Sequence, residues 1–366
     1  MTRFIANIFA FFFISIICYS ISFAESPTAF KFGVSAPLSG ILAEYGTAVR
    51  NGIDLAIKDR PENFDKIELL YEDSQWDPKT AIAAFNVLKN AKGAQLIFNW
   101  GNPTSEAVAP LAERYQYPLL VMSLDPSVAL KREYVIRSLR SGNELGELLG
   151  AHISAKGYKK VGVLLAENSY VQGLYEGLQK SLSKTSTKLD LLAQVNMSEQ
   201  DFKSSISRLK QNGYDAVAVF LITGQVRSYF QQAESLGLKL PAFGADFFGS
   251  QTEIEASGVG IEGAVFPDLS VTKEFRNRYL QTYGNDIQIS FAANAYDVAT
   301  QVALLFSDSA ASKLKPKEII ERLRTSPVLN GAHGSFAYEN DKIYGPAFVS
   351  DIVLRQVRKK EIVNIQ

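Results

Sequence analysis

"AQLIFNWGNPTSEAVAPLAERYQYPLLVMS" (residues 94–123) reads as a strand, a helix and a second strand, and this order decides the fold class. The apolar runs 94–99 and 118–123 are typical of buried strands, and residues 103–115 between them follow a helical pattern. A helix that connects two neighbouring strands indicates a parallel sheet covered by helices. We therefore predict an α/β fold.

The same alternation continues on both sides of this stretch. In the N-terminal part we expect strands at 30–38 and 66–73 and helices at 43–59 and 77–90. It restarts after residue 140, with helices expected at 144–157, 170–183, 201–212 and 224–236 and strands at 159–167, 189–196, 214–221, 241–245 and 262–267. Two such units in tandem predict two Rossmann-like lobes, each with a parallel sheet flanked by helices.

The C-terminal part changes character after residue 270. Three helices are expected there, at 272–283, 289–307 and 316–325, followed by a closing strand or hairpin within 346–362. Because these helices have no sheet of their own, we expect them to return and cover the first unit. The chain would then cross between the lobes several times, which suits a hinge.

This return sets the expected domain division. The first lobe takes residues 25–139 plus about 268–334, and the second takes about 140–267 plus 335–366.

The first 24 residues read as an export signal. Arg3 precedes the apolar run "FIANIFAFFFISIICYSISF", and the small residues Ser22 and Ala24 mark a cleavage site after Ala24. An uncleaved membrane anchor is the alternative, because the apolar run is nearly long enough to span a bilayer. Cleavage would remove Cys18, the only cysteine, so the exported chain would form no disulfide.

Composition excludes several function classes. The chain has 366 residues, of which 46% are hydrophobic, and a formal net charge of zero, so it lacks the basic footprint of a nucleic-acid-binding protein. No cluster of His, Cys and carboxylate residues has metal-ligand spacing. "GVGIEG" (258–263) has dinucleotide-loop spacing but precedes a strand instead of following one. We expect a binding protein without metal, cofactor or catalytic residues.

Two similar triplets follow neighbouring strands. Asn102–Thr104 and Asp125–Ser127 each place an Asx residue, a proline and a hydroxyl residue where a helix would begin. Helix N-termini at the carboxyl ends of parallel strands favour anions. Thr104 and Ser127 would then donate hydrogen bonds to a ligand carboxylate. The alternative is that the Asx residues only cap helices and the hydroxyls face water.

Three further residues follow strand ends. Asp246 in "GADFFGSQ" either caps the next helix or faces a ligand cation. Tyr45 and Tyr170 either wall a binding site with an apolar ring and a polar tip or simply pack between helix and sheet.

Several segments of the sequence together resemble a known protein family. "VSAPLSGILAEYGTAVRNGIDLAI", "YEDSQWDPKTAIAAF", "AERYQYPLLVMS" and "VGVLLAENSYVQGLYEGLQ" resemble, in this order, periplasmic binding proteins of the leucine/isoleucine/valine type. The segment from Asp201 to Gly244 extends the resemblance over nearly the whole exported chain. The resemblance implies a type 1 fold, with two lobes joined by three crossings that close on a ligand, and service to an ATP-driven (ABC) importer.

The resemblance also implies roles for individual residues. The carboxylate site of the amino-acid binders matches Thr104 or Ser105, the backbone at Asp125, and Ser127. The partner of the ligand ammonium matches Asp246.

Aromatic walls in the family match Tyr45 and Tyr170. Three departures leave the ligand open: Asp125 replaces a small residue, Ile222 replaces a tyrosine, and Trp76 lies near the position of a missing disulfide.

We therefore expect a monomeric periplasmic solute-binding protein, exported through a cleaved signal peptide. It would bind a small polar ligand, an amino acid first of all, between its lobes and deliver it to the membrane permease of an ABC importer. The alternatives are a ligand-sensing component of a signalling system, or a binder of an amide, urea or an aromatic carboxylate.

Overall fold

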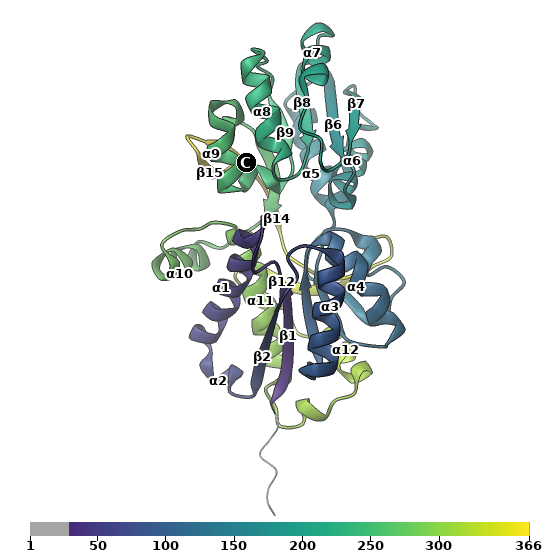
Figure 1. Cartoon of the computed structure of the whole chain (residues 1–366), viewed down its shortest axis with the longest axis vertical. Coiled ribbons are helices and arrows are strands. Elements are labelled where there is room, and N and C mark those ends of the chain that lie inside the picture. The colour runs from purple at the N-terminus through teal and green to yellow at the C-terminus, as the bar shows by residue number, and fades with distance from the viewer. Residues whose placement is uncertain (1–28, 366) are drawn as a thin grey trace, which may run out of the picture.

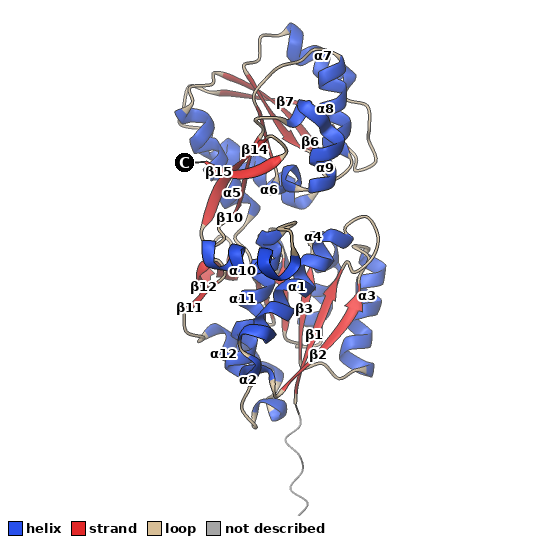
Figure 2. Ribbon diagram, turned by 90° about the vertical axis from the view of Figure 1, so that its left-hand side faces the viewer, coloured by secondary structure: helices blue, strands red, loops and turns tan. Residues whose placement is uncertain are grey.

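The structure is a computed structural model that describes residues 29–365, so the predicted export signal lies outside the described residues. The described chain forms two lobes stacked along the long axis of the molecule (Figure 1). Each lobe contains one mostly parallel sheet with helices on both faces, which confirms the predicted fold class. Figure 2 shows the strands of both lobes in a view turned by 90°.

The sheet of the first lobe has eight strands in the order β11-β12-β13-β5-β4-β3-β1-β2. Their bounds are β1 Phe30–Ala36, β2 Ile67–Asp73, β3 Leu96–Trp100, β4 Leu119–Met122, β5 Val135–Arg137, β11 Leu329–Gly331, β12 Gly334–Asp341 and β13 Gly345–Val349. Helices α1 (Ala43–Asp59) and α11 (Ile289–Phe306) pack together on one face, and α3 (Pro78–Asn86) and α4 (Asn102–Arg114) pack on the other. The remaining helices of this lobe are α2 Pro61–Phe64, α10 Lys273–Tyr283 and α12 Pro316–Arg324.

The sheet of the second lobe has seven strands in the order β15-β14-β10-β9-β8-β6-β7. Their bounds are β6 Lys160–Ala166, β7 Lys188–Val195, β8 Ala216–Phe220, β9 Ala242–Gly244, β10 Val265–Leu269, β14 Ile352–Arg358 and β15 Glu361–Ile365. The helices are α5 Gly142–Ala155, α6 Ser169–Leu182, α7 Lys203–Gln211, α8 Gln225–Ser235 and α9 Gln251–Ser257. Helices α5 and α6 pack tightly against each other on one side of the sheet.

Burial explains the apolar runs that predicted the strands. Every residue of the central strands β3 and β8 is buried, because helices cover both faces of each sheet. Helix α11 is the one described helix long and apolar enough to cross a membrane, but 89% of it is buried inside the protein. Its hydropathy therefore reflects its position in the core beside α1.

The chain passes between the lobes three times. The crossings lie between β5 and α5, between β10 and α10, and between β13 and β14. The last one differs from the expected division at residue 334, because β12 and β13 still pair within the first sheet and the chain crosses at Ser350 and Asp351. The apolar pattern within 346–362 predicts a closing strand or hairpin, but it carries no information about which sheet that segment joins.

Candidate functional site

A cleft between the lobes lies at the carboxyl ends of the strands of the first sheet, where ligands of open α/β sheets bind. Both lobes contribute to its wall, which is mainly apolar and contains six aromatic side chains. The aromatic residues are Tyr45, Trp76, Trp100, Tyr170, Phe247 and Phe291. The enclosed space is about 40 Å³, room for a few water molecules, so the lobes are drawn together and a solute requires them to part.

The aromatic side of the first lobe is a packed cluster of three rings. The ring centroid of Tyr45 lies 5.2 Å from that of Trp100 and 5.2 Å from that of Phe291. Trp100 and Phe291 are 5.9 Å apart, edge to face. In the second lobe, Tyr170 packs edge to face on Phe247 at 6.0 Å. These contacts hold the rings in fixed orientations around the cleft.

Two buried polar atoms in the cleft wall, Tyr45 Oη and Trp100 Nε1, have no hydrogen-bond partner within residues 29–365. The Tyr170 hydroxyl and the Asp246 carboxylate, in the second lobe, interact with each other. Buried polar groups are nearly always paired in folded proteins, because an unmade hydrogen bond costs about 1–3 kcal/mol. The cleft is therefore built to be completed by polar atoms of a bound molecule.

Asp246 is the one carboxylate in the described wall of this cleft. It lies in a 3-10 turn (Asp246–Gly249) directly after β9, and its carboxylate does not cap α9. The pKa of Asp246 is raised to about 7, mainly by burial and in smaller part by the nearby charge of Asp268, while a hydrogen bond from the Tyr170 hydroxyl opposes the rise. Of the two roles expected for Asp246, the cap of the next helix is thus excluded, and the contact with a ligand cation stays a prediction.

Tyr45 and Tyr170 also reach the cleft, from opposite lobes. Burial raises the pKa of both hydroxyls, and the second cause in each case is the charge of Asp246. The charge of Asp246 therefore acts on both hydroxyls.

Thr104 and Ser105 lie at the expected place, but their hydroxyls turn away from the cleft. Both side chains are fully buried, and the hydroxyl of each accepts a 3.1 Å hydrogen bond from Asn99 Nδ2. The Thr104 hydroxyl donates back to the backbone carbonyls of Trp100 and Gly101. These hydroxyls hold the start of α4 on the end of β3.

The first Asx residue does not cap its helix. Asn102 is the first residue of α4, and Gly101 precedes it as the N-cap without a side-chain bond. Asn102 Oδ1 instead accepts hydrogen bonds of 3.0 Å from the Ser123 hydroxyl and from the Leu124 amide. Asn102 thus ties the two strand ends together, so the two triplets do lie side by side.

The second triplet begins only a single 3-10 turn and no α-helix. Asp125 caps a single 3-10 turn (Pro126–Val128), and its carboxylate accepts a 2.8 Å bond from the Ser127 amide. Ser127 is exposed, and neither residue is part of the cleft wall. The expected double helix start for a ligand carboxylate is therefore absent from the described chain.

Four aromatic wall residues were not predicted as site residues: Trp76, Trp100, Phe247 and Phe291. Trp100 ends β3 and Phe247 follows Asp246, so the strand-end rule that selected their neighbours could have found both. Phe291 comes from α11, far along the chain, and no local signal places it beside Tyr45.

Polar contacts close the rim of the cleft on two sides. On one side, Glu44 of α1 accepts hydrogen bonds from the hydroxyl of Ser250 (2.8 Å) and the amide of Gln288 (2.9 Å). On the other, Ser169 of α6 donates to Glu106 of α4. Because Ser250 and Ser169 belong to the second lobe, these contacts form only when the lobes meet.

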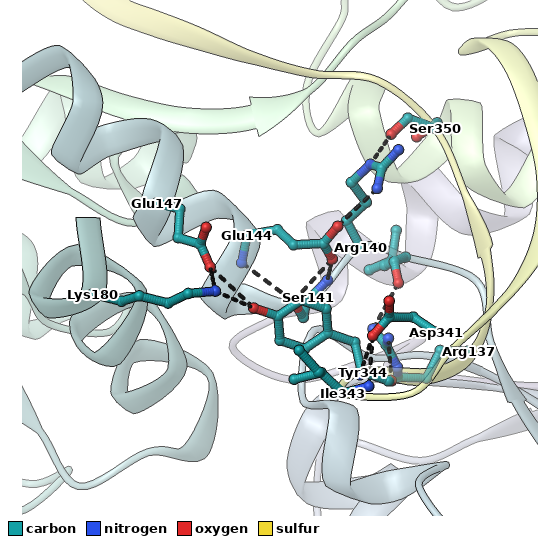
Figure 3. A network of polar contacts seen from close by, with 11 residues as sticks. Arg137, Arg140, Ser141, Glu144, Glu147, Lys180, Asp341, Ile343, Tyr344 and Ser350 are labelled. Carbon is teal, nitrogen blue, oxygen red and sulfur yellow. Dashed lines mark hydrogen bonds and ion pairs between the residues drawn. The ribbon is translucent and has the colours of Figure 1, made fainter.

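The hinge holds a second polar network (Figure 3). Arg140, in the first crossing, donates a 2.7 Å bond to the carbonyl of Ser350 in the third crossing and a 2.7 Å bond to Glu144 of α5. Tyr344, in the turn before β13, donates a 3.0 Å bond to Glu147, which also pairs with Lys180 at 2.6 Å. The network links the first lobe to α5 and α6.

The second crossing is tied by a buried ion pair. Arg355 Nε of β14 lies 3.0 Å from Asp268 Oδ2 of β10, and the Ser290 hydroxyl of α11 donates a 2.7 Å bond to the same oxygen. Asp268 therefore joins both lobes at the point where the chain passes between them.

Two sheets linked by three crossings, around a cleft with unpartnered polar groups, define a hinged two-lobe binding protein. The chain belongs to the periplasmic binding protein family, whose sequence profile matches residues 29–360. This confirms the resemblance read from the sequence, and the family's name places its members in the periplasm.

Known relatives align with almost the whole chain. The Leu/Ile/Val-binding protein homolog 2 of Brucella abortus is 25% identical over 350 residues, which cover 90% of each chain. The crystal structure of a leucine binding protein LivK from Thermotoga maritima superposes with a TM-score of 0.82 at 21% identity, covering 92% of this chain and 98% of that one. A solute binding protein of an ABC transporter from Rhodopseudomonas palustris, in complex with 3,4-dihydroxybenzoic acid, has a TM-score of 0.79 at 21% identity, with coverage of 92% and 96%.

Proposed function

We propose that this protein is exported through cleavage of its first 24 residues, captures a small solute between its lobes and delivers it to the permease of an ABC importer. Family membership and the relatives' names support the role of a solute-binding protein. The observation that carries the proposal is a buried cleft shared by two hinged lobes, with aromatic side chains, two unpartnered polar atoms (Tyr45 Oη and Trp100 Nε1) and the buried carboxylate of Asp246 in its wall. We infer binding without catalysis, because the cleft wall provides Asp246 as its sole ionisable group apart from tyrosines.

An amino acid with an apolar side chain is the ligand that the wall supports best. Its ammonium would lie on Asp246, the single carboxylate in the described wall, and its side chain would contact the aromatic rings. A buried carboxylate paired with an ammonium forms a charge-assisted hydrogen bond, which is stronger than a neutral one. The named relatives bind, by their names, leucine, isoleucine and valine.

An aromatic carboxylate is the second candidate. Six aromatic side chains line the cleft, and aromatic rings favour edge-to-face or offset contact with another ring. The raised pKa of Asp246, about 7, lets this group exist as a neutral acid that does not repel an anion. One structural neighbour holds a dihydroxybenzoic acid.

A thermal-shift screen of amino acids and aromatic acids tests the proposal. A ligand at a hundred times its dissociation constant should stabilise the folded protein by about 2.7 kcal/mol, which raises the melting temperature measurably. Hits are then titrated by calorimetry against wild type and Asp246→Asn. An absence of any stabilising solute in both classes would contradict the proposed ligand classes.

A further inference from the structure

Trp100 occupies a fixed position on the first-lobe side of the cleft. It is the last residue of β3, and its side chain is 6% exposed. Tyr45 and Phe291 contact its ring at centroid distances of 5.2 and 5.9 Å. The indole plane is therefore set by packing before any ligand arrives.

The indole nitrogen of Trp100 is buried, and it has no hydrogen-bond partner in the chain from residue 29 to 365. An indole N–H can only donate, whereas a tyrosine hydroxyl can donate or accept. Of the two unpartnered atoms in the cleft, Tyr45 Oη and Trp100 Nε1, the indole nitrogen is thus the one whose partner must be an acceptor whatever the pH. The hydroxyls of Thr104 and Ser105, expected to take this role, are already engaged with Asn99 and the backbone.

We propose that Trp100 Nε1 donates the hydrogen bond that recognises the acceptor end of the ligand, a carboxylate oxygen of the amino acid, opposite the ammonium on Asp246. This inference rests on the proposed function and adds a specificity residue to it. Two donors from the same aromatic cluster, Trp100 Nε1 and Tyr45 Oη, then face the ligand from the first lobe. A solute that lacks the acceptor leaves the indole N–H buried and unpaired, so the site rejects it.

Tryptophan fluorescence can report ligand contact with Trp100. The chain has two tryptophans, Trp76 and Trp100, and both line the cleft. In the Trp76→Phe variant the remaining tryptophan emission comes from Trp100 alone. We expect saturation with the amino acid found in the screen to change this emission, and saturation with the matching amine, which lacks the carboxylate, to leave it unchanged.

Affinity gives the second readout. Calorimetry of wild type and Trp100→Phe should show roughly a tenfold or larger loss for the amino acid, because a hydrogen bond to a charged group is lost. The matching amine should bind both proteins with similar, weak affinity. A melting curve of each variant shows that it is folded.

Three outcomes would overturn the inference about Trp100, and a fourth would contradict the proposed function. Unchanged affinity of Trp100→Phe for the amino acid overturns the inference and leaves the proposed function standing. Equal losses for the amino acid and the amine assign Trp100 a packing role only and also overturn it. If Trp100→Phe does not fold, an unchanged Trp100 emission in the ligand-saturated Trp76→Phe protein overturns it. Failure of wild type to bind any solute contradicts the proposed function itself.

Discussion

The hydroxyl of Ser250, in the second lobe, donates a 2.8 Å hydrogen bond to the carboxylate of Glu44, in the first turn of α1 in the first lobe. Gln288 donates to the same oxygen and holds the carboxylate in place. A ligand favours the closed arrangement only by its differential affinity for it, and contacts between the lobes shift the same equilibrium. The hydrogen bond between Ser250 and Glu44 therefore stabilises the closed arrangement without involving the ligand.

Glu44→Ala should weaken ligand binding by about 1 kcal/mol, or roughly fivefold, because a partly exposed hydrogen bond of the closed state is lost. Small-angle scattering should also show a larger radius of gyration for the variant at sub-saturating ligand. Glu255→Ala is the matched control, since Glu255 is exposed and accepts a hydrogen bond from Gln251 of the same helix. Equal behaviour of the two variants would show that the Glu44 contact does not stabilise closure.

Asp268→Ala should destabilise the fold by about 3–5 kcal/mol, because it leaves the buried Arg355 cation without its counter-ion. Urea unfolding measures this loss. Glu321→Ala is the comparison, since its ion pair with Arg324 is on the surface and should change stability by less than about 0.5 kcal/mol. A small effect of Asp268→Ala would mean that Arg355 finds other acceptors, beyond its 3.1 Å bond to the carbonyl of Leu269.

Much of the fold could be predicted from the sequence, because apolar periodicity reports burial directly. The helix expected at 43–59 is α1 with the same bounds, and the strand pattern of both sheets follows the apolar runs. The short strands β5 and β11 were not predicted, since three residues carry too little pattern. Membership of β12 and β13 in the first sheet depends on long-range pairing, which no local pattern encodes.

The positions of several site residues could be predicted from the sequence, but their side-chain orientations could not. The strand-end rule located Asp246, Tyr45 and Tyr170 correctly on the cleft. It could not show that the hydroxyl of Thr104 turns toward its own backbone, since a rotamer depends on tertiary neighbours such as Asn99. The helix expected after Asp125 stops after one turn, as β5 begins at Val135.

Gly101→Ala should destabilise the protein and disturb the cleft. Gly101 has φ +95° and ψ 149°, a backbone region open almost only to glycine, and an added Cβ would lie 3.2 Å from Trp76 Cδ1. We expect a loss of about 1–3 kcal/mol in unfolding free energy together with weaker ligand binding. Gly213→Ala separates the two effects, because Gly213 has φ +64° and no atom lies within 4 Å of its added Cβ. Gly213→Ala should cost stability but leave ligand affinity unchanged, and similar binding defects in both variants would contradict a local effect at Trp76.

The pH dependence of binding should reveal which class of ligand the cleft takes. Burial raises the pKa of Asp246 to about 7 in the ligand-free site. An ammonium on Asp246 stabilises the ionised form and lowers this pKa in the complex. Affinity for an amino acid is then full above about pH 7 and falls as the pH drops below it, by up to tenfold per unit, because binding must release a proton.

An acid without an amine reverses the sign of this dependence. Its carboxylate favours protonated Asp246 and raises the pKa in the complex, so affinity is full below about pH 7 and falls as the pH rises through it. Tyr45 and Tyr170, on which the charge of Asp246 acts, stay neutral in this range, because burial raises their pKa values well above 10. Calorimetry between pH 5.5 and 8.5, a range of about 1.5 units on either side of this pKa, should therefore give opposite slopes for an amino acid and for its deaminated analogue. Asp246→Asn should flatten both slopes, and a slope that survives in this variant would show that a group other than Asp246 controls binding.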